Sequence, residues 1–317
     1  MIYKFFTYLW YKGNLILLIP FLPLSLLFFL IIVIRKFLYT KILKRYVSKN
    51  KVIIIGNLSV GGSGKTPFTI WLSNYLKKNK KRFSIISSGY GSNISSPQII
   101  NDKSDPHEVG DEAVLIHKLT DNMTVSSNNR VQSNVFCDQY DLDYVIHDDG
   151  LQHYRLSRDY EFIIVKNEKI KNKFLLPSGP FREPCFFHPH GKFISSNYYY
   201  NDIPGFYSKI SSIKNSMTGE SLSIEDHRFK NSLLITAIAD NRIIIEELEK
   251  YKINLQAINY PDHYKFKKSD FDELKLPILI TQKDFVKIKK LNLKNIFILE
   301  QSIVPNGKLI ELVEKLL

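Results

Sequence analysis

The sequence predicts an α/β protein whose parallel sheet is covered by helices on both faces. Short, wholly apolar runs of strand length alternate with longer amphipathic runs, as in buried parallel strands joined by helices. A glycine-rich segment directly follows the first apolar run and opens a helical stretch. The expected strands lie at 52–58, 83–88, 123–127, 143–149 and 161–166, with a helix at 111–119 between two of them.

A second, smaller α/β domain is expected near the C-terminus. The region from about Phe181 to Asp226 is rich in Pro, Ser, Asn and Tyr and has weak periodicity, so we interpret it as a connector with a short β-ribbon. A second alternating series follows, and 317 residues suffice for two modest domains. The expected division is an N-terminal membrane anchor with its basic flank at 1–45, the main α/β domain at 46–185, the connector at 186–226 and the smaller α/β domain at 227–317.

Residues 15–34 form an uncharged apolar run, and Lys and Arg are dense directly after it. At about 1.5 Å per residue, a helix of that length covers about 30 Å, the thickness of a bilayer's hydrocarbon core. Pro20 and Pro23 would kink the helix, which suits a bent segment in one leaflet. The basic flank favours a cytoplasmic position for the rest of the chain. We therefore expect a membrane-associated helix, either spanning or lying on the surface; a buried core helix is the alternative.

The composition favours an anionic partner. The chain has 44 basic and 31 acidic residues, a net charge of +13, which suits a phospholipid surface or a phosphorylated substrate. We expect no nucleic-acid partner, because no recognised nucleic-acid motif accompanies the charge. The two cysteines, Cys137 and Cys185, are too few for a disulfide framework and have no metal-site spacing.

The most specific local feature is a phosphate-binding loop between the first expected strand and a helix running to about Lys78. Glycines let backbone N–H groups close around phosphate oxygens, and the helix start adds positive potential. In such a loop Lys65 neutralises the β- and γ-phosphates and the Thr66 hydroxyl ligates Mg²⁺. The strict pattern has glycine where this chain has Ser59. The residues expected to bind nucleotide are Ser59, Val60, Gly61, Gly62, Ser63, Gly64, Lys65 and Thr66.

Two aspartates end another apolar strand. Asp148 and Asp149 follow Tyr-Val-Ile-His, where a Walker-B carboxylate holds Mg²⁺ through its water shell. The alternative is an ordinary polar strand end. Beside a phosphate-binding loop we prefer the magnesium interpretation, so ATP and Mg²⁺ are the expected ligands.

Seven motifs together resemble one family. The segments GNLSVGGSGKTP, SSGYG, VGDEA, HDDGLQHYRLSRD, LPSGPFREP, YPDHY and TQKD occur in the order found in tetraacyldisaccharide 4′-kinases, the lipid A kinases. The resemblance implies transfer of the ATP γ-phosphate to the 4′-hydroxyl of a tetraacylated glucosamine disaccharide 1-phosphate. That lipid A precursor would be met at the cytosolic face of the inner membrane. It also implies that 46–185 is a P-loop kinase domain joined by a β-ribbon to the smaller domain.

The resemblance also implies roles for residues that match the motifs. Asp111 and His263 match the catalytic aspartate and its partner histidine, and Lys65 matches the lysine of the phosphate-binding loop. Glu112 matches a metal-associated carboxylate, and Arg182 a basic residue placed to meet the transferring phosphate. A sugar hydroxyl is a poor nucleophile at neutral pH, so a carboxylate must accept its proton. We expect Asp111 to do this, with His263 orienting it or tuning its pKa as the two domains close.

Some positions depart from the family pattern or leave alternatives open. Ser88 stands where arginine is common, which leaves any phosphate contact of that arginine in doubt, and His147 replaces an aliphatic residue, a change we expect to affect only packing. In TQKD, Lys283 could pack on a nucleotide base and Asp284 accept from it. The alternative is a polar strand-to-helix turn in which the aspartate is a cap.

Two other functions are compatible with part of the sequence. A membrane-associated nucleotide switch explains the phosphate-binding loop and basic surface, but not VGDE and DHY beside an apolar segment. A small-metabolite kinase whose anchor only localises it is the third possibility. Transfer of phosphate to an acceptor, rather than slow hydrolysis, separates a kinase from a switch.

Overall fold

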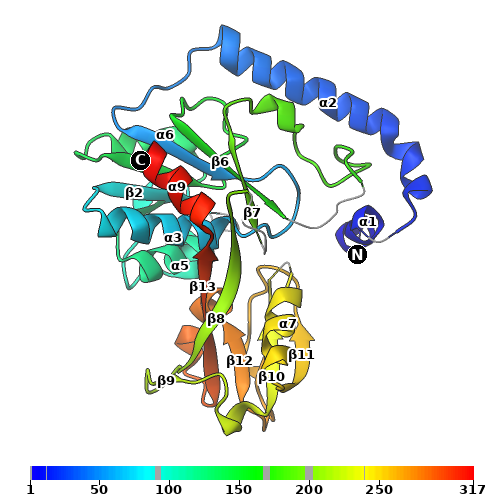
Figure 1. Cartoon of the computed structure of the whole chain (residues 1–317), viewed down its shortest axis with the longest axis vertical. Coiled ribbons are helices and arrows are strands. Elements are labelled where there is room, and N and C mark those ends of the chain that lie inside the picture. Colours follow the sequence, from blue (N-terminus) through cyan, green and yellow to red (C-terminus); the bar gives the residue numbers. More distant parts are fainter. Residues whose placement is uncertain (1, 12, 90–93, 167–171, 197–202, 239) are drawn as a thin grey trace.

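The computed structural model describes residues 2–11, 13–89, 94–166, 172–196, 203–238 and 240–317. Its strands form one continuous hydrogen-bonded path in the order β11-β10-β12-β13-β8-β7-β6-β1-β5-β2-β4-β3. Most strands in both halves of this path are parallel, with an antiparallel pair, β8 with β13, between the halves and a second antiparallel pair, β4 with β3, at one edge. The structure confirms the predicted α/β class (Figure 1).

The part of the path from β7 to β3, with its helices, is called the large lobe below. Its central strands are almost wholly apolar and buried, with Ile53, Ile54 and Ile55 of β1 fully inaccessible, as expected for a parallel sheet covered on both faces. The strands are β1 (Lys51–Gly56), β2 (Phe83–Ser87), β3 (Gln98–Ile99), β4 (Thr124–Ser126), β5 (Tyr144–Asp148), β6 (Tyr160–Lys166) and β7 (Lys192–Ser196). The helices are α3 (Lys65–Lys78), α4 (Pro106–Val109), α5 (Asp111–Thr120), α6 (Arg130–Cys137) and the short η3 (Cys185–Phe187).

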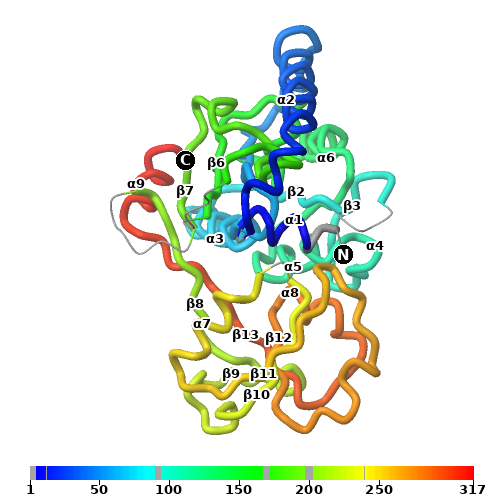
Figure 2. The backbone as a smooth tube through the Cα atoms, turned by 90° about the vertical axis from the view of Figure 1, so that its right-hand side faces the viewer, coloured from blue at the N-terminus to red at the C-terminus, as the bar shows by residue number. Residues whose placement is uncertain are grey.

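The other end of the path, from β12 to β11, is called the small lobe. Hydrophobic clusters cover both faces of its sheet, one around Leu234, Leu248 and Leu279, the other around Ile235 and Phe266. Its elements are β9 (Ser221–Leu222), η4 (His227–Phe229), β10 (Asn231–Thr236), α7 (Arg242–Lys250), β11 (Asn254–Asn259), η5 (Lys268–Asp270), β12 (Ile278–Thr281), α8 (Gln282–Ile288) and η6 (Lys289–Leu291). Figure 2 shows α8 of this lobe beside α5 of the large lobe.

Two long strands join the lobes. The first is β8 (Gly205–Asn215) and the second is β13 (Ile296–Pro305), paired antiparallel from Phe297 with Asn215 to Pro305 with Phe206. The register shifts between Glu300 and Gln301, in the middle of this ribbon. The sequence predicted a ribbon in the connector, but its second strand comes from near the C-terminus.

The chain end differs from the expectation that 227–317 would all lie in the smaller domain. Ile303 of β13, with Leu309 and Val313 of α9 (Gly307–Leu316), is buried in the same hydrophobic cluster as Phe68 and Leu72 of α3. The reason is that β13 runs back along β8 and returns the chain to the large lobe (Figure 1). In addition, β7 pairs with β6 in the main sheet, although the sequence placed it in the connector.

The N-terminal elements lie along the large lobe. Trp10 Nε1 donates to the Pro177 carbonyl at 2.9 Å, Ser25 Oγ donates to the Leu175 carbonyl at 3.0 Å, and Lys36 Nζ donates to a carbonyl of η3. The buried residues of the long helical stretch recur every seven positions, about two turns, so they share one side: Leu18, Ser25 and Ile32. The elements are α1 (Ile2–Tyr11), η1 (Leu15–Phe21), α2 (Leu22–Phe37) and η2 (Leu38–Ile42).

Most of the remaining surface of this stretch is exposed and apolar. The exposed large side chains include Ile16, Leu17, Ile19, Leu24, Leu26, Leu27, Leu30, Ile31, Ile34 and Phe37. Residues Leu15–Ile42 form a helical stretch of 28 residues that is long and apolar enough to cross a membrane, on length and composition alone. Only 17% of its most apolar window is buried, which argues against the alternative of a core helix.

Replacing Leu309 with alanine is expected to destabilise the large lobe. Leu309 is fully buried against α3, so its truncation leaves a cavity and should lower the free energy of unfolding by about 2–5 kcal/mol. Ile310→Ala, on the exposed side of the same helix, is the control and should cost far less. Urea denaturation measures both, and equal losses would contradict the assignment of α9 to the large-lobe core.

Candidate active site

The glycine-rich loop predicted to bind phosphate, called the phosphate-binding loop below, lies where β1 ends and α3 begins. Gly64 caps α3 with φ at 88°, and a Cβ at this position would lie 3.2 Å from the ring of Phe206 on β8. Gly61 also has a positive φ, of 108°, which glycine adopts readily. The loop conformation therefore depends on glycine at these two positions.

A neighbouring segment holds the loop from outside. The Val60 N–H donates to the Pro180 carbonyl at 2.8 Å, and the Arg182 N–H donates to the Leu58 carbonyl at 2.7 Å. This pairing places the Arg182 side chain beside the loop. Within the described chain, the Ser63 hydroxyl is buried without a hydrogen-bond partner, a feature that fits an external acceptor such as a phosphate oxygen.

Two cations of the site converge on Asp149. Its Oδ1 lies 3.5 Å from Lys65 Nζ and 3.7 Å from Arg182 Nη1. Burial alone would raise the pKa of Asp149, but Lys65 and Arg182 outweigh it and keep the pKa below its usual value. Asp149 also has a left-handed backbone, with φ at 55°, which turns the chain sharply after β5.

The other aspartate of the pair is tied to α3. Asp148 accepts hydrogen bonds from the hydroxyls of Thr66 at 3.1 Å and Thr69 at 2.8 Å. Burial raises its pKa, and the nearby Glu112 carboxylate raises it further. A buried carboxylate joined to the loop threonine is the arrangement expected of a Walker-B aspartate.

Arg130, the first residue of α6, was not predicted as a site residue from the sequence. Its buried guanidinium donates to the backbone carbonyls of Ile86, at the end of β2, and Asp148, at the end of β5. The only sequence signal was its place just after an expected strand, since no motif marks it. Arg130 ties two strand ends together beneath the aspartates and adds a positive charge near them.

Asp111 and His263 meet although 152 residues separate them in sequence. His263 Nδ1 lies 3.1 Å from Asp111 Oδ2, with Asp111 at the start of α5 and His263 in a turn of the small lobe with φ at 59°. The hydrogen bond to Asp111 raises the pKa of His263. Burial would raise the pKa of Asp111, but His263 and Lys283 together lower it. The geometry therefore keeps this carboxylate ionised next to an imidazole.

Glu112 and Lys283 form a second contact between the lobes. Lys283 Nζ lies 3.1 Å from Glu112 Oε1 and 3.5 Å from Asp262 Oδ1. Burial would lower the pKa of Lys283, but the surrounding carboxylates of Glu112, Asp111 and Asp262 raise it well above its usual value. Lys283 thus lies among the acidic residues of the site.

The structure places Asp284 inside the small lobe. Its carboxylate is fully buried, accepts from the Thr281 hydroxyl at 2.8 Å and the Ala237 N–H at 3.1 Å, and lies 2.6 Å from Lys287 Nζ. Thr281 in turn caps α8. These contacts favour the alternative given above, a polar strand-to-helix turn, over a contact with a nucleotide base.

The residues predicted for magnesium lie on neighbouring elements. Among the described residues, no three His, Cys, Asp or Glu side chains are grouped closely enough to hold a metal ion by themselves. Mg²⁺ usually binds one or two carboxylates and keeps water or phosphate oxygens as its other ligands. The Thr66 hydroxyl with the Asp148 and Asp149 carboxylates fits that donor set, with Glu112 nearby.

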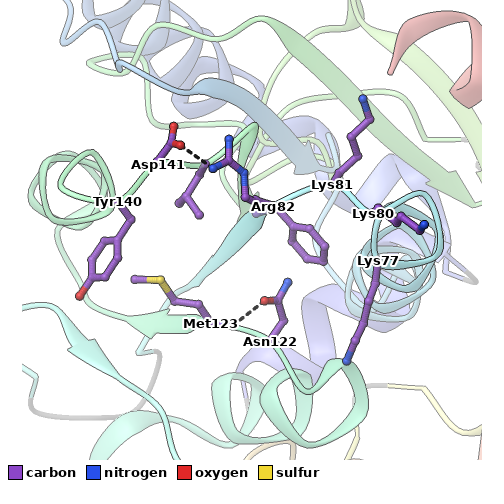
Figure 3. A pocket seen from close by; sticks show the side chains of 10 residues that line it. Lys77, Lys80, Lys81, Arg82, Asn122, Met123, Tyr140 and Asp141 are labelled. Carbon is purple, nitrogen blue, oxygen red and sulfur yellow. Dashed lines mark hydrogen bonds and ion pairs between the residues drawn. The ribbon is translucent and has the colours of Figure 1, made fainter.

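A separate pocket lies at the opposite edge of the main sheet. It has a volume of about 460 Å³ and is formed where β2, β4 and β5 begin (Figure 3). Lys77 and Arg82 in its wall already pair with Asp121 and with Asp141, respectively. This pocket is far from the loop, Asp111 and His263, because parallel strands place those residues at their carboxyl ends.

Comparison with known proteins identifies the family. The family model for tetraacyldisaccharide-1-P 4′-kinase matches residues 17–317. The chain belongs to this family.

Individual proteins similar to this chain bear the name of the same family. A tetraacyldisaccharide 4′-kinase from Pasteurella multocida is 38% identical over 290 residues, covering 86% of this chain and 87% of the relative. The one from Coxiella burnetii is 34% identical and covers 94% and 90%. The crystal structure of LpxK from Aquifex aeolicus in complex with ATP matches with a TM-score of 0.76 at 28% identity, covering 94% of this chain and 99% of that one.

The two departures from the family pattern lie at strand ends. Ser88 directly follows β2, and its carbonyl approaches Gly110, the N-cap of α5. His147 is fully buried on β5, with Nε2 at 3.0 Å from Asn134 Oδ1 on α6. Burial holds the pKa of His147 well below its usual value, so the imidazole is neutral.

The His263–Asp111 contact predicts a pH-dependent stability. Because folding raises the pKa of His263, its contribution is complete below the unfolded pKa of about 6.5 and is lost as pH rises through the folded value. His263→Gln should therefore cost about 1–2 kcal/mol at about pH 5.5 and much less at about pH 9. Urea denaturation at both pH values checks this, with exposed His190→Gln as control. A loss independent of pH would contradict a charged pair.

Proposed function

We propose that this protein transfers the γ-phosphate of ATP to the 4′-hydroxyl of tetraacyldisaccharide 1-phosphate, a step of lipid A biosynthesis. The Asp111–His263 contact, at the same edge of the sheet as the phosphate-binding loop, carries the proposal. A nucleotide switch needs no ionised carboxylate with a histidine partner at this place, whereas transfer to an alcohol does. Family membership and the names of the relatives support the same reaction.

The proposed roles follow from the contacts. Asp111 accepts the proton of the sugar hydroxyl, and its lowered pKa keeps it ready to do so at neutral pH. His263 holds the carboxylate in place and shares its charge. Lys65 and Arg182, both beside Asp149, are placed to neutralise charge on the transferring phosphoryl group.

Magnesium is part of the proposal. Thr66, Asp148 and Asp149 would hold the ion, with Glu112 beside them, and the ion supplies neutralisation of phosphate charge when bound. Burial and Glu112 raise the pKa of Asp148, and a cation bound at this place would offset that effect by favouring the ionised carboxylate. The loop residues from Ser59 to Thr66 bind the ATP phosphates, with Lys283 at the opposite side of the site.

We also propose that the protein docks on the cytosolic face of the inner membrane through residues 15–34. The helices lie along the large lobe and are held to it at Trp10, Ser25 and Lys36, while their outer side is apolar. This arrangement supports a helix lying in one leaflet, which leaves the active site within reach of a lipid headgroup. The four-part domain division given above, with β7 and the C-terminal helix moved to the kinase part, completes the proposal.

The test is transfer of label from ATP. The full-length protein with Mg²⁺, γ-labelled ATP and tetraacyldisaccharide 1-phosphate in detergent micelles should produce a labelled lipid. Asp111→Ala and His263→Ala should each lower kcat by about 10²–10⁴ without comparable loss of ATP affinity. The double variant should be little worse than the worse single one, because residues that act as a unit are not additive.

Lys65→Ala is the matching control for nucleotide binding and should lose both ATP affinity and transfer. Label released only as inorganic phosphate would favour the nucleotide switch. Label passed only to a water-soluble sugar would favour a metabolite kinase. Normal turnover of His263→Ala would remove the histidine from the mechanism and leave Asp111 alone.

Membrane docking predicts a loss of binding when charge is placed on the exposed side of α2. Leu27→Asp with Ile31→Asp should release the protein from vesicles of phosphatidylethanolamine and phosphatidylglycerol, because each buried charge costs about 2–3 kcal/mol. Flotation measures binding. The control, Ile310→Asp, changes an exposed apolar residue on α9 and should still float. Unchanged flotation of the double variant in high salt would place the anchor elsewhere.

A further inference from the structure

The lobes contact each other on two sides of the phosphate-binding loop. On one side, α8 packs against α4 and α5, with Val286 in a cluster of large-lobe residues and Lys290 2.5 Å from Asp105. The contacts of His263 and Lys283 belong to this side. On the other side, Lys166 Nζ lies 2.8 Å from Asp240 Oδ2.

Lys166 lies close to the phosphate-binding loop in the main sheet. Lys166 is the last residue of β6, and β6 lies directly beside β1, the strand that leads into the phosphate-binding loop. Because all these strands are parallel, Lys166 is at the same edge of the sheet as the loop. Asp240 precedes α7 in the small lobe. The loop therefore lies between the Lys166–Asp240 pair and the contacts of α8.

The pair is sheltered from solvent. The side chains of Lys166 and Asp240 are only 14% and 15% exposed, so solvent screens their interaction less than that of a surface pair. Asp240 also binds Arg242 of its own lobe at 2.8 Å, so its carboxylate joins one cation from each lobe. Removing Lys166 would leave a half-buried carboxylate with a cation from the small lobe alone.

We propose that Lys166 and Asp240 are positioning residues that hold the small lobe closed, so that His263 reaches Asp111. The inference rests on the proposed kinase reaction, but the contact acts through lobe position and touches neither reactant. With the α8 contacts alone, the small lobe is held on one side of the loop only and can rock about the ribbon, which loosens the contacts on that side, His263 with Asp111 among them. The ion pair fixes the other side.

The experiment compares five full-length variants. Lys166→Met and Asp240→Asn should each lower kcat/KM for lipid phosphorylation about tenfold, and the double variant should be no worse than the worse single one. Lys166→Arg keeps the cation and should retain most activity. The matched control is Arg242→Met, which removes a pair of the same length to the same carboxylate within one lobe and should stay within about twofold of wild type.

Hydrogen exchange gives a readout that does not need the acceptor. In Lys166→Met and Asp240→Asn, the amides around His263 and in α8 should exchange faster, while those of β1 and β5 in the large lobe should not change. If Lys166→Met phosphorylated the lipid as fast as wild type, the proposal would be overturned. The same holds if the losses of kcat/KM in the two single variants multiplied in the double variant. If the wild-type protein phosphorylates no lipid, the proposed function fails, and the exchange measurement still decides whether the pair closes the lobes.

Discussion

The pairing of β8 with β13 is the constraint on which the rest of the structure depends. At the start of β8, Phe206 packs against both Gly64 of the phosphate-binding loop and Phe68 of α3. Farther along the same strand, Ile213 is buried in a small-lobe cluster. One extended ribbon thus sets how far the small lobe lies from the loop, and therefore whether His263 can reach Asp111. The register shift within the ribbon marks the point where bending would change that distance.

The charges at the site are arranged in linked pairs. Asp149 lies between Lys65 and Arg182, Lys283 lies beside Glu112, and Glu112 acts on the pKa of Asp148. A buried charge without a partner is costly, so Asp149 and Lys283 depend on their oppositely charged neighbours for their ionised forms. Removing Lys65 or Arg182 would therefore raise the pKa of Asp149, and removing Glu112 would lower the pKa of Lys283. The site is therefore one electrostatic unit that spans both lobes.

Local patterns were enough to predict the α/β class, most strands of the large lobe, and the glycine-rich turn between β1 and α3. An apolar run is itself the segment that becomes buried, and a glycine-rich loop sets its own backbone conformation. Both can therefore be predicted from neighbouring residues alone. The return of α9 to the large lobe, the Arg130 contacts and the Lys166–Asp240 pair depend on which distant segments meet, and no local pattern encodes that. Asp111 and His263 were matched only through the family resemblance. Asp284 belongs to the TQKD motif, whose composition allowed a contact with a nucleotide base, but its carboxylate is buried inside the small lobe.

The segment from 172 to 188 connects the N-terminal helices to the phosphate-binding loop. Ser25 and Lys36 of α2 bond to carbonyls of this segment, and the same segment pairs with residues 58–60 and carries Arg182. If α2 lies on the bilayer as proposed, the hydrogen bonds that hold the helix also fix the height of Arg182 above the lipid headgroups. A lipid hydroxyl would then have to reach a site whose distance from the membrane this segment helps to set. The acceptor would then be selected first by how far its hydroxyl lies from the membrane, before the sugar makes any contact with the site.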